Sequence, residues 1–257
     1  MSFAIALTDE QWELVADLFD PPGWRGAPAQ IPRRQMVEAR LFVARTGCQW
    51  RYLPERYGAW SAVWAQWRRW RANGVWARAM LRLAQVIRIL HEREPGPSMV
   101  MVDAQTVKGA RYGPTFHEAG GRGGRTIGTK RSLLVEILGL PLAAHASSAR
   151  PHDVSAAREF LGEHLPDLPR VRAIVGDRAY RGLTRLAERK RVRLDIKAPP
   201  PGSSGFVPIR PLYKIEHTFA QLGRWRRLSR CYEGTEASAR AWLEVASVGY
   251  LAWRAVT

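Results

Sequence analysis

The segment Val171-Arg172-Ala173-Ile174-Val175-Gly176-Asp177-Arg178-Ala179-Tyr180 decides how the chain is expected to fold. The apolar residues before Gly176 predict a short buried strand, which stops at the carboxylate of Asp177. Open α/β sheets place functional groups at the C-terminal edge of such strands, so Asp177 is a candidate for chemistry. The alternative is an aspartate that only begins a turn or caps a helix.

The composition is that of a globular protein, with 257 residues of which 46% are hydrophobic and 25% charged. No apolar run reaches the ~18 residues of a membrane span, and the first residues lack the pattern of a secretory signal. The two cysteines, Cys48 and Cys231, form neither a disulfide framework nor a metal-knuckle spacing. We therefore expect a cytoplasmic protein that does not contact a membrane.

The net charge of +17 is the most informative feature of the composition. The chain carries +5 up to Pro97 and +12 after it, so the excess is spread through folded segments. This distribution favours an extended polyanion, most simply nucleic acid, as the partner. Nearly all the cations are arginines, which suit bidentate phosphate contacts. A GC-rich genome would explain the ratio of arginine to lysine but not the net charge.

Residues 1–97 predict a helical unit that ends at Pro95-Gly96-Pro97. Four helices are expected. The first opens with a capping box at Thr8–Gln11, and the second begins near Pro32 and ends near Gly47. The third spans Ala62–Arg71 after a Ser61 cap, and the fourth spans about Val75–His91.

The third of these helices combines tryptophans on one face with Arg68, Arg69 and Arg71 on its flank. Tryptophan is usually buried, so this face is interpreted as core and the arginines as candidates for DNA contacts. A short helix that follows a turn in a helical unit is compatible with helix-turn-helix recognition.

From Ser98 the pattern changes to a mixture of strands and helices. The expected strands are Met99–Val102 ending in Asp103, a hairpin of Lys130–Leu138 and Leu142–Ser147, the strand before Asp177, and Arg193–Ala198. The expected helices are Asp153–His164, Leu183–Arg191, Leu212–Arg230 and Trp242–Trp253. Gly109–Gly128 and Pro199–Pro211 are expected to be loops.

Three carboxylates can then meet, because strands laid side by side bring Asp103 and Asp177 to one sheet edge and a crossing helix adds Glu216. Three such groups repel one another unless a cation lies among them. Oxygen ligands at an open site favour Mg²⁺ or Mn²⁺, and two such ions can assist an in-line phosphoryl displacement. The alternative is that Asp103 simply ends a strand and Glu216 favours its helix N-terminus.

Several segments resemble the DDE transposases of bacterial insertion sequences, in the group numbered four/five. The three acidic motifs are matched by Asp103–Lys108, Gly176–Gly182 and Ile215–Ser229, the second strand by Thr126–Leu140, and the helical N-terminal region by Leu7–Trp12 and Gly47–Tyr57. The resemblance covers nearly the whole chain.

The resemblance implies an α/β fold, with a ribonuclease-H-like mixed sheet flanked by helices over residues 98–257 and a helical DNA-binding region over 1–97. It implies that Asp103, Asp177 and Glu216 bind two divalent ions, Mg²⁺ or Mn²⁺. Water would cut the ends of the element, and the freed 3′-hydroxyl would attack target DNA. The implied partner is double-stranded DNA, bound by a homodimer or higher oligomer in the nucleoid of a bacterium.

Further candidates for DNA binding are basic residues near the motifs. They are Lys108, Lys130, Arg178, Lys214, Arg224 and Arg227, with Arg68, Arg69 and Arg71 of the N-terminal unit. At helical steps Ala220, Gly223 and Arg227 share a face with Glu216, which would let DNA approach. For any one of these cations the alternative is a side chain that only solvates the surface.

Two other functions stay open at this point. One is a catalytically inactive DNA-binding relative or a regulator of transposition; the other is a ribonuclease-H-like nuclease or resolvase without strand transfer. The presence of all three acids favours the active transposase, and the helical unit favours binding at the element's ends.

Overall fold

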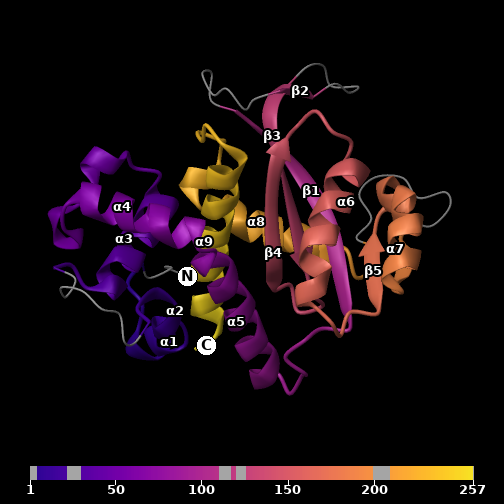
Figure 1. Ribbon diagram of the computed structural model, residues 1–257, viewed down its shortest axis with the longest axis horizontal. Coiled ribbons are helices and arrows are strands. Elements are labelled where there is room, and N and C mark those ends of the chain that lie inside the picture. The colour runs from indigo at the N-terminus through magenta and orange to yellow at the C-terminus, as the bar shows by residue number, and fades with distance from the viewer. Residues whose placement is uncertain (1–4, 22–29, 110–116, 120–125, 199–208, 257) are drawn as a thin grey trace.

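The computed structural model describes residues 5–21, 30–109, 117–119, 126–198 and 209–256. A helical N-terminal part lies on one side and a mixed sheet with its covering helices on the other (Figure 1). The helices are α1 (Asp9–Glu13), α2 (Ala16–Phe19), α3 (Arg33–Thr46), α4 (Trp60–Ala72), α5 (Val75–Leu90), α6 (Asp153–His164), α7 (Thr184–Lys190), α8 (Tyr213–Gly223) and α9 (Glu236–Arg254). The strands are β1 (Met99–Lys108), β2 (His117–Ala119), β3 (Thr126–Val135), β4 (Pro141–Ser148), β5 (Ala173–Gly176) and β6 (Arg193–Ile196).

The sheet has the strand order β4-β3-β1-β5-β6, and β2 also pairs with β3. The hairpin of β3 and β4 and the pair β1–β3 are antiparallel, whereas β1–β5 and β5–β6 are parallel. Helices α5, α8 and α9 contact the sheet on one side, and α6 packs on the other (Figure 1). This is the mixed, helix-flanked, ribonuclease-H-like arrangement that the sequence predicted.

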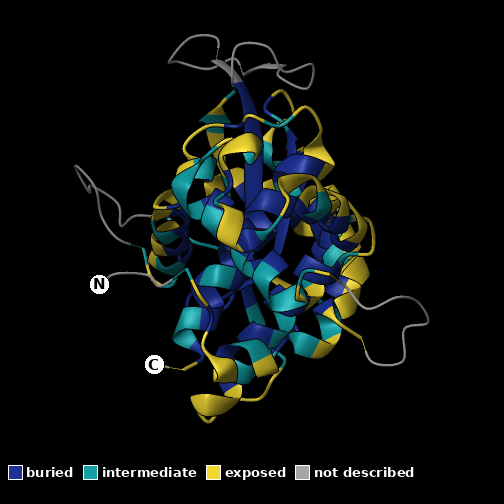
Figure 2. Ribbon diagram, turned by 90° about the vertical axis from the view of Figure 1, so that its left-hand side faces the viewer, coloured by how far each residue is buried: buried dark blue, intermediate teal, exposed yellow. Residues whose placement is uncertain are grey.

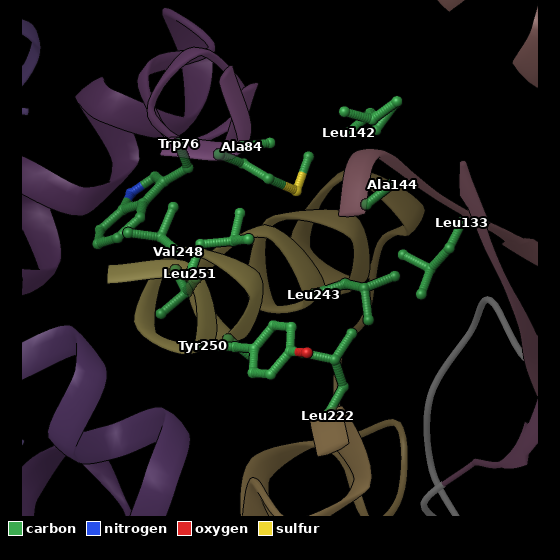
Figure 3. Close-up of a cluster of buried hydrophobic side chains, with 14 of the residues drawn as sticks. Trp76, Ala84, Leu133, Leu142, Ala144, Leu222, Leu243, Val248, Tyr250 and Leu251 are labelled. Atoms are coloured by element: carbon green, nitrogen blue, oxygen red, sulfur yellow. The ribbon is translucent and has the colours of Figure 1, made fainter. Parts of the chain in front are cut away.

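Helix α9 forms the centre of the hydrophobic core, because it contacts both the helical N-terminal part and the sheet. Figure 3 shows Leu243 of α9 beside Leu133 of β3, and Val248 and Leu251 beside Trp76 of α5. The buried strands therefore lie at the centre of the molecule, with the exposed residues on the outer faces of the helices (Figure 2). Among the described residues, no helix has the length and apolarity that crossing a bilayer requires.

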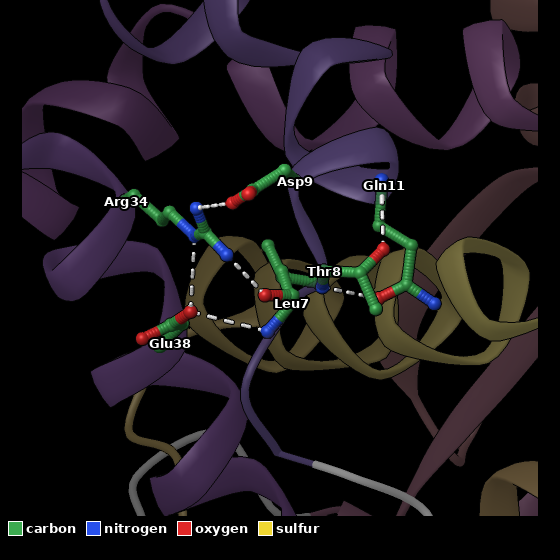
Figure 4. Close-up of polar contacts among 6 residues, drawn as sticks. All are labelled: Leu7, Thr8, Asp9, Gln11, Arg34 and Glu38. Atoms are coloured by element: carbon green, nitrogen blue, oxygen red, sulfur yellow. Dashed lines mark hydrogen bonds and ion pairs between the residues drawn. The ribbon is translucent and has the colours of Figure 1, made fainter.

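The start of the chain is fixed by the predicted capping box (Figure 4). The Thr8 hydroxyl accepts from the Gln11 backbone N–H at 3.2 Å, and the Gln11 side chain accepts from the Thr8 N–H at 3.0 Å. Arg34 on α3 then donates to Asp9, Glu38 and the Leu7 carbonyl. These contacts hold the first helix against α3.

A buried cation joins three parts of the helical unit to α9. The guanidinium of Arg40 on α3 lies 4.4, 4.0 and 3.7 Å from the ring centres of Trp50, Trp67 and Trp242, which is a cation–π arrangement. Burial lowers the pKa of Arg40 well below its usual range, and the charge of Glu233 acts in the opposite direction. Within the described chain its side-chain nitrogens have no hydrogen-bond partner, so the rings supply their stabilisation.

Two predictions for the third helix of the helical unit, its start and the burial of its tryptophan face, were wrong in part. The helix expected at Ala62–Arg71 begins at Trp60, so Ser61 lies inside it and does not cap it. Only part of its tryptophan face is core, since Trp67 and Trp70 are buried whereas Trp60 and Trp64 are 38% and 36% exposed.

Three boundaries differ in the sheet part. Strand β1 continues past Asp103 to Lys108 because β3 pairs with it over that length. The helix that contains Glu216 ends at Gly223, after which the chain turns and buries Trp225 in the core. The final helix begins at Glu236, where the Thr235 hydroxyl caps it by accepting from the Ser238 N–H. The predicted loops are replaced in part by β2 and the start of β3, and 110–116, 120–125 and 199–208 lie outside the described residues.

The tight packing of Trp225 on α9 gives a test of the core. A Cβ added at Gly249 would lie 2.3 Å from the Trp225 ring, whereas a Cβ at Gly162 of α6 meets nothing within 4 Å. Gly249→Ala should lower the free energy of unfolding by about 1–3 kcal/mol through overpacking. Gly162→Ala, the matched control, should raise it by up to about 1 kcal/mol through helix propensity. Chemical denaturation measures both; equal effects would contradict the described packing.

Candidate active site

The parallel pairing of β1 with β5 places the first two candidate acids side by side. Met101 is paired with Val175, and two further steps along both strands reach Asp103 and Asp177. Asp103 lies within β1, while Asp177 follows the last residue of β5 directly. Asp177 therefore follows the C-terminal end of its strand, as predicted. Asp103 lies at the same level of the sheet, but inside the longer strand β1.

Gly176 and Tyr180 shape the turn that follows β5. Asp177 caps the 3₁₀ helix Arg178–Leu183, and its carboxylate accepts from the Ala179 N–H at 2.9 Å. The side chain of Tyr180 folds back beneath the strand end, where a Cβ on Gly176 would lie 2.9 Å from it. Capping, the alternative interpretation of Asp177, thus coexists with its exposed position beside β1.

Glu216 lies in the first turn of α8, and this helix packs against β1 and β3. Ile215 and Phe219 turn into the core, which leaves Glu216 exposed. At helical steps Ala220 and Gly223 follow Glu216 along the same stripe, as predicted.

The charges of Asp177 and Glu216 both act on Asp103. The pKa of the Asp103 carboxyl is raised to about 6, mainly by burial; a backbone hydrogen bond with Ala104 acts in the opposite direction, and the charges of Asp177, Asp153 and Glu216 add smaller increases. The pKa of the buried Tyr180 phenol is also raised, first by burial, then by these aspartates and by a hydrogen bond with the Asp103 side chain. Tyr180 is therefore a neutral donor at the carboxylate of Asp103.

Asp153, which the sequence analysis did not single out, is a fourth acid beside this site. It lies in the first turn of α6 and forms a 2.6 Å ion pair with Lys130 of β3. Lys130 also donates to the Pro151 carbonyl and is 5% exposed, so it is enclosed by the protein. Only the acidic first turn of the predicted helix could have indicated Asp153.

The donor set is one that hard divalent cations prefer, because it consists of carboxylate oxygens at a partly open site. Within the described ranges, no group of three His, Cys, Asp or Glu side chains is arranged to hold a metal ion. Asp177 and Glu216 are exposed, so their side chains can change rotamer without disturbing the core. The residues therefore suit such an ion by the chemistry of their oxygen donors.

The predicted DNA-binding cations differ in how exposed they are and in whether an acid of the protein pairs with them. Exposed side chains are those of Arg68, Arg69, Lys108, Arg178 and Arg224, while Arg71 and Lys214 are partly buried. Arg68 lies 4.9 Å from the Trp64 ring, and Arg71 lies 4.9 Å from the Trp67 ring. Lys130 and Arg227 are the two that the protein itself pairs with acids.

The predicted position of Arg227 was wrong. Because α8 ends at Gly223, Arg227 lies in the 3₁₀ helix Arg226–Leu228 and not on the Glu216 stripe. Its guanidinium forms an ion pair with Glu233 and lies 5.1 Å from the Trp242 ring. Arg227 thus supports the packing of α9.

Comparison with known proteins places these features in a family. The model of the IS4/5 transposase family matches residues 7–80, and the model of the transposase DDE domain matches residues 94–198. A protein of Sinorhizobium fredii (strain NBRC 101917 / NGR234), "Uncharacterized protein y4sN", is 34% identical over 120 residues, which are 46% of this chain and 87% of that protein. The chain belongs to the IS4/5 family of DDE transposases.

Two further similarities are partial. The Burkholderia cepacia protein "Insertion element IS402 uncharacterized 16.2 kDa protein" is 40% identical over 78 residues, 28% of this chain. The chain spans about half of that relative, 53% of its length. The solved structure titled "Crystal structure of a pre-cleavage Mos1 transpososome" aligns with 92% of this chain and 80% of its own, at 14% identity and a TM-score of 0.29.

The raised pKa of Asp103 predicts how stability depends on pH without metal. The folded-state pKa of about 6 exceeds the ordinary 3.8, so ionising Asp103 destabilises the fold as pH rises between these values. Asp103→Asn should therefore stabilise the protein in chelator at pH 8, by up to about 3 kcal/mol, and have little effect near pH 4.

Denaturant unfolding at the two pH values measures this difference. Asp167→Asn removes an exposed carboxylate that is not among the groups acting on Asp103, and it controls for the change in net charge. An equal effect of Asp103→Asn at both pH values would contradict the buried, acid-facing position of Asp103.

Proposed function

We propose that the protein is a DNA transposase that binds the terminal inverted repeats of its insertion sequence, cleaves the DNA ends by metal-dependent hydrolysis and joins the 3′-hydroxyl to target DNA. The observation that carries this proposal is the β1–β5 register that sets Asp103 beside Asp177, with Glu216 near enough for its charge to act on Asp103. Membership of the DDE family and the net charge of +17 support it.

In this proposal Asp103, Asp177 and Glu216 hold two divalent ions, Mg²⁺ or Mn²⁺. Such ions stabilise the attacking and leaving oxygens of an in-line phosphoryl displacement. Asp103 supplies a half-buried carboxylate whose ionisation is costly alone, so a bound cation is favoured there. Asp177 and Glu216 supply exposed carboxylates that can close on the site from β5 and α8.

The surrounding residues position the acids. The Tyr180 phenol keeps its proton beside the Asp103 carboxyl, where a neutral hydroxyl can donate to the ionised acid. The Lys130–Asp153 pair fixes the start of α6 beside the site. Each of these groups acts through an acid and not on DNA.

The DNA partner of the helical unit would lie along α4. Trp60 and Trp64 are exposed on this helix beside Arg68, and Arg51 lies 5.9 Å from the Trp60 ring. Exposed cations beside aromatic rings suit phosphate and sugar contacts, which position a protein on the duplex. We infer that this unit, residues 1–97, selects the element ends, and that the catalytic unit is residues 98–257.

The proposal includes assembly as a homodimer or higher oligomer on paired ends, in the bacterial cytoplasm at the nucleoid. A catalytically inactive DNA-binding relative is the second candidate. Such a relative would share the basic surface of α4 but would not cleave or join DNA. The next experiment distinguishes the active transposase from the inactive relative.

Asp177→Asn and Glu216→Gln should each abolish cleavage of DNA that carries the repeats flanking the gene, because each removes a carboxylate charge that holds the cations. End binding should stay within about twofold, since neither residue lies on α4. Wild-type cleavage should appear with Mg²⁺ or Mn²⁺ and be absent with Ca²⁺ or chelator. Gel assays of labelled ends measure nicking and joining, and mobility shifts measure binding.

Glu188→Gln on α7 is the matched control, because it removes an exposed carboxylate outside the site. Binding without cleavage by the wild type would favour the inactive relative. Unchanged cleavage by either site variant would remove that residue from the mechanism.

A further inference from the structure

A basic groove lies between α8 and the C-terminal end of α9, separate from the aromatic surface of α4. It has a volume of about 490 Å³. Its lining consists of Leu138, Lys214, His217, Gln221, Arg224, Tyr250, Trp253 and Arg254. Among these lining residues there is no carboxylate, so the groove carries only positive and neutral groups.

The cations come from both helices and converge on one surface. Lys214 belongs to α8, Arg224 is the residue that caps the C-terminal end of α8, and Arg254 ends α9. Arg45 of α3 adds a fourth cation at the rim, where it donates to the Arg224 carbonyl at 2.9 Å. The proximity of Arg224 contributes to lowering the pKa of Arg45, after the effect of burial. Like charges held this close favour an anionic partner.

The groove is preorganised as well as charged. Arg254 donates to the Leu138 carbonyl at 3.2 Å and to the Tyr250 hydroxyl at 3.1 Å, which fixes its guanidinium at the wall. The side chains of His217 and Gln221 lie 3.0 Å apart. His217 and Arg224 are exposed, so a ligand can reach them.

The groove lies directly beside the proposed catalytic acids. Lys214, His217, Gln221 and Arg224 follow one another at three- and four-residue steps and form one stripe of α8. Glu216, Ala220 and Gly223 form the next stripe of the same helix. At 1.5 Å per residue, the basic stripe from 214 to 224 is about 15 Å long. One strand of DNA presents about four phosphates over that length.

We propose that this groove binds the phosphate backbone of the DNA duplex next to the phosphate that is cut. The proposal rests on the proposed function, and it adds α9 and His217 to the DNA-binding surface. A long, open stripe of cations fits a repeating polyanion. The groove would set the register of the duplex on α8, so that the phosphate beyond it meets Glu216. Contacts of this kind position the DNA without reading its sequence.

The test is the double variant Lys214→Gln/Arg224→Gln in the full chain. Its affinity for a repeat-bearing duplex and for an unrelated duplex should fall by the same factor. The slope of log affinity against log salt should become shallower by about 2, because two phosphate contacts are lost. The matched control is Arg185→Gln/Arg189→Gln on α7, which removes the same charge from an exposed surface away from the groove and should change the slope by less than 0.5 (about half of one phosphate contact).

A second variant pair locates the effect. Arg68→Gln/Arg69→Gln on α4 should lower affinity for the repeats more than for the unrelated duplex, whereas the groove variant lowers both alike. Thermal unfolding confirms that each variant is folded. In addition, the thiol of Gln221→Cys should exchange with a mixed disulfide tethered to the duplex backbone within about four nucleotides of the cut, which links protein to DNA and releases the small leaving thiol.

Equal affinity and salt slope for the groove variant and the α7 control would overturn the groove proposal. So would cross-linking of Gln221→Cys only to DNA far from the cut. In either case wild-type cleavage would still support the proposed function. Conversely, metal-independent or absent cleavage with an intact groove effect would overturn the function but leave a DNA-binding groove.

Discussion

The parallel pairing of β1 with β5 is the constraint on which the candidate site depends. It sets Met101 against Val175, so the chain reaches Asp103 and Asp177 at one level of the sheet. Gly176 lets Tyr180 fold back under the strand end, where its phenol donates to Asp103. Helix α8 packs across β1 and β3 and adds Glu216. The register thus sets Asp103 beside Asp177, and the charge of Glu216 acts on Asp103 from α8. In the proposed function, the cost of ionising Asp103 favours a cation there.

The helical unit and the sheet are held together by α9. This helix packs against α5 and β4, and its Trp242 closes the ring of indoles around Arg40 of α3. Arg227, which pairs with Glu233, lies against the same indole. The basic surfaces of α4 and of the α8–α9 groove are therefore parts of one packed body. In the proposed function this connection fixes the distance between the DNA end that α4 holds and the carboxylates that cut it.

Periodic apolar patterns predicted most of the fold, because buried strands and amphipathic helices depend on local sequence. The hairpin, α6, β5 and the capping box at Thr8 were confirmed. The end of α8 was not predictable, since it depends on Trp225 finding space beside Gly249 on a distant helix. Ion pairs formed by the fold likewise hid the partners of Lys130 and Arg227, both of which seemed free to bind DNA. The three acids could be named from sequence, but Asp153 required the fold.

The central claim is that Asp103, Asp177 and Glu216 share a cation site created by the β1–β5 register. Anomalous diffraction from crystals soaked in Mn²⁺ tests it most directly. The account predicts manganese density at about 2.0–2.4 Å from carboxylate oxygens of Asp103 and Asp177, with Glu216 turned toward the same density, and its loss in Asp103→Asn crystals. Manganese bound elsewhere on the chain, or bound at this edge equally well in the Asp103→Asn crystals, would contradict it.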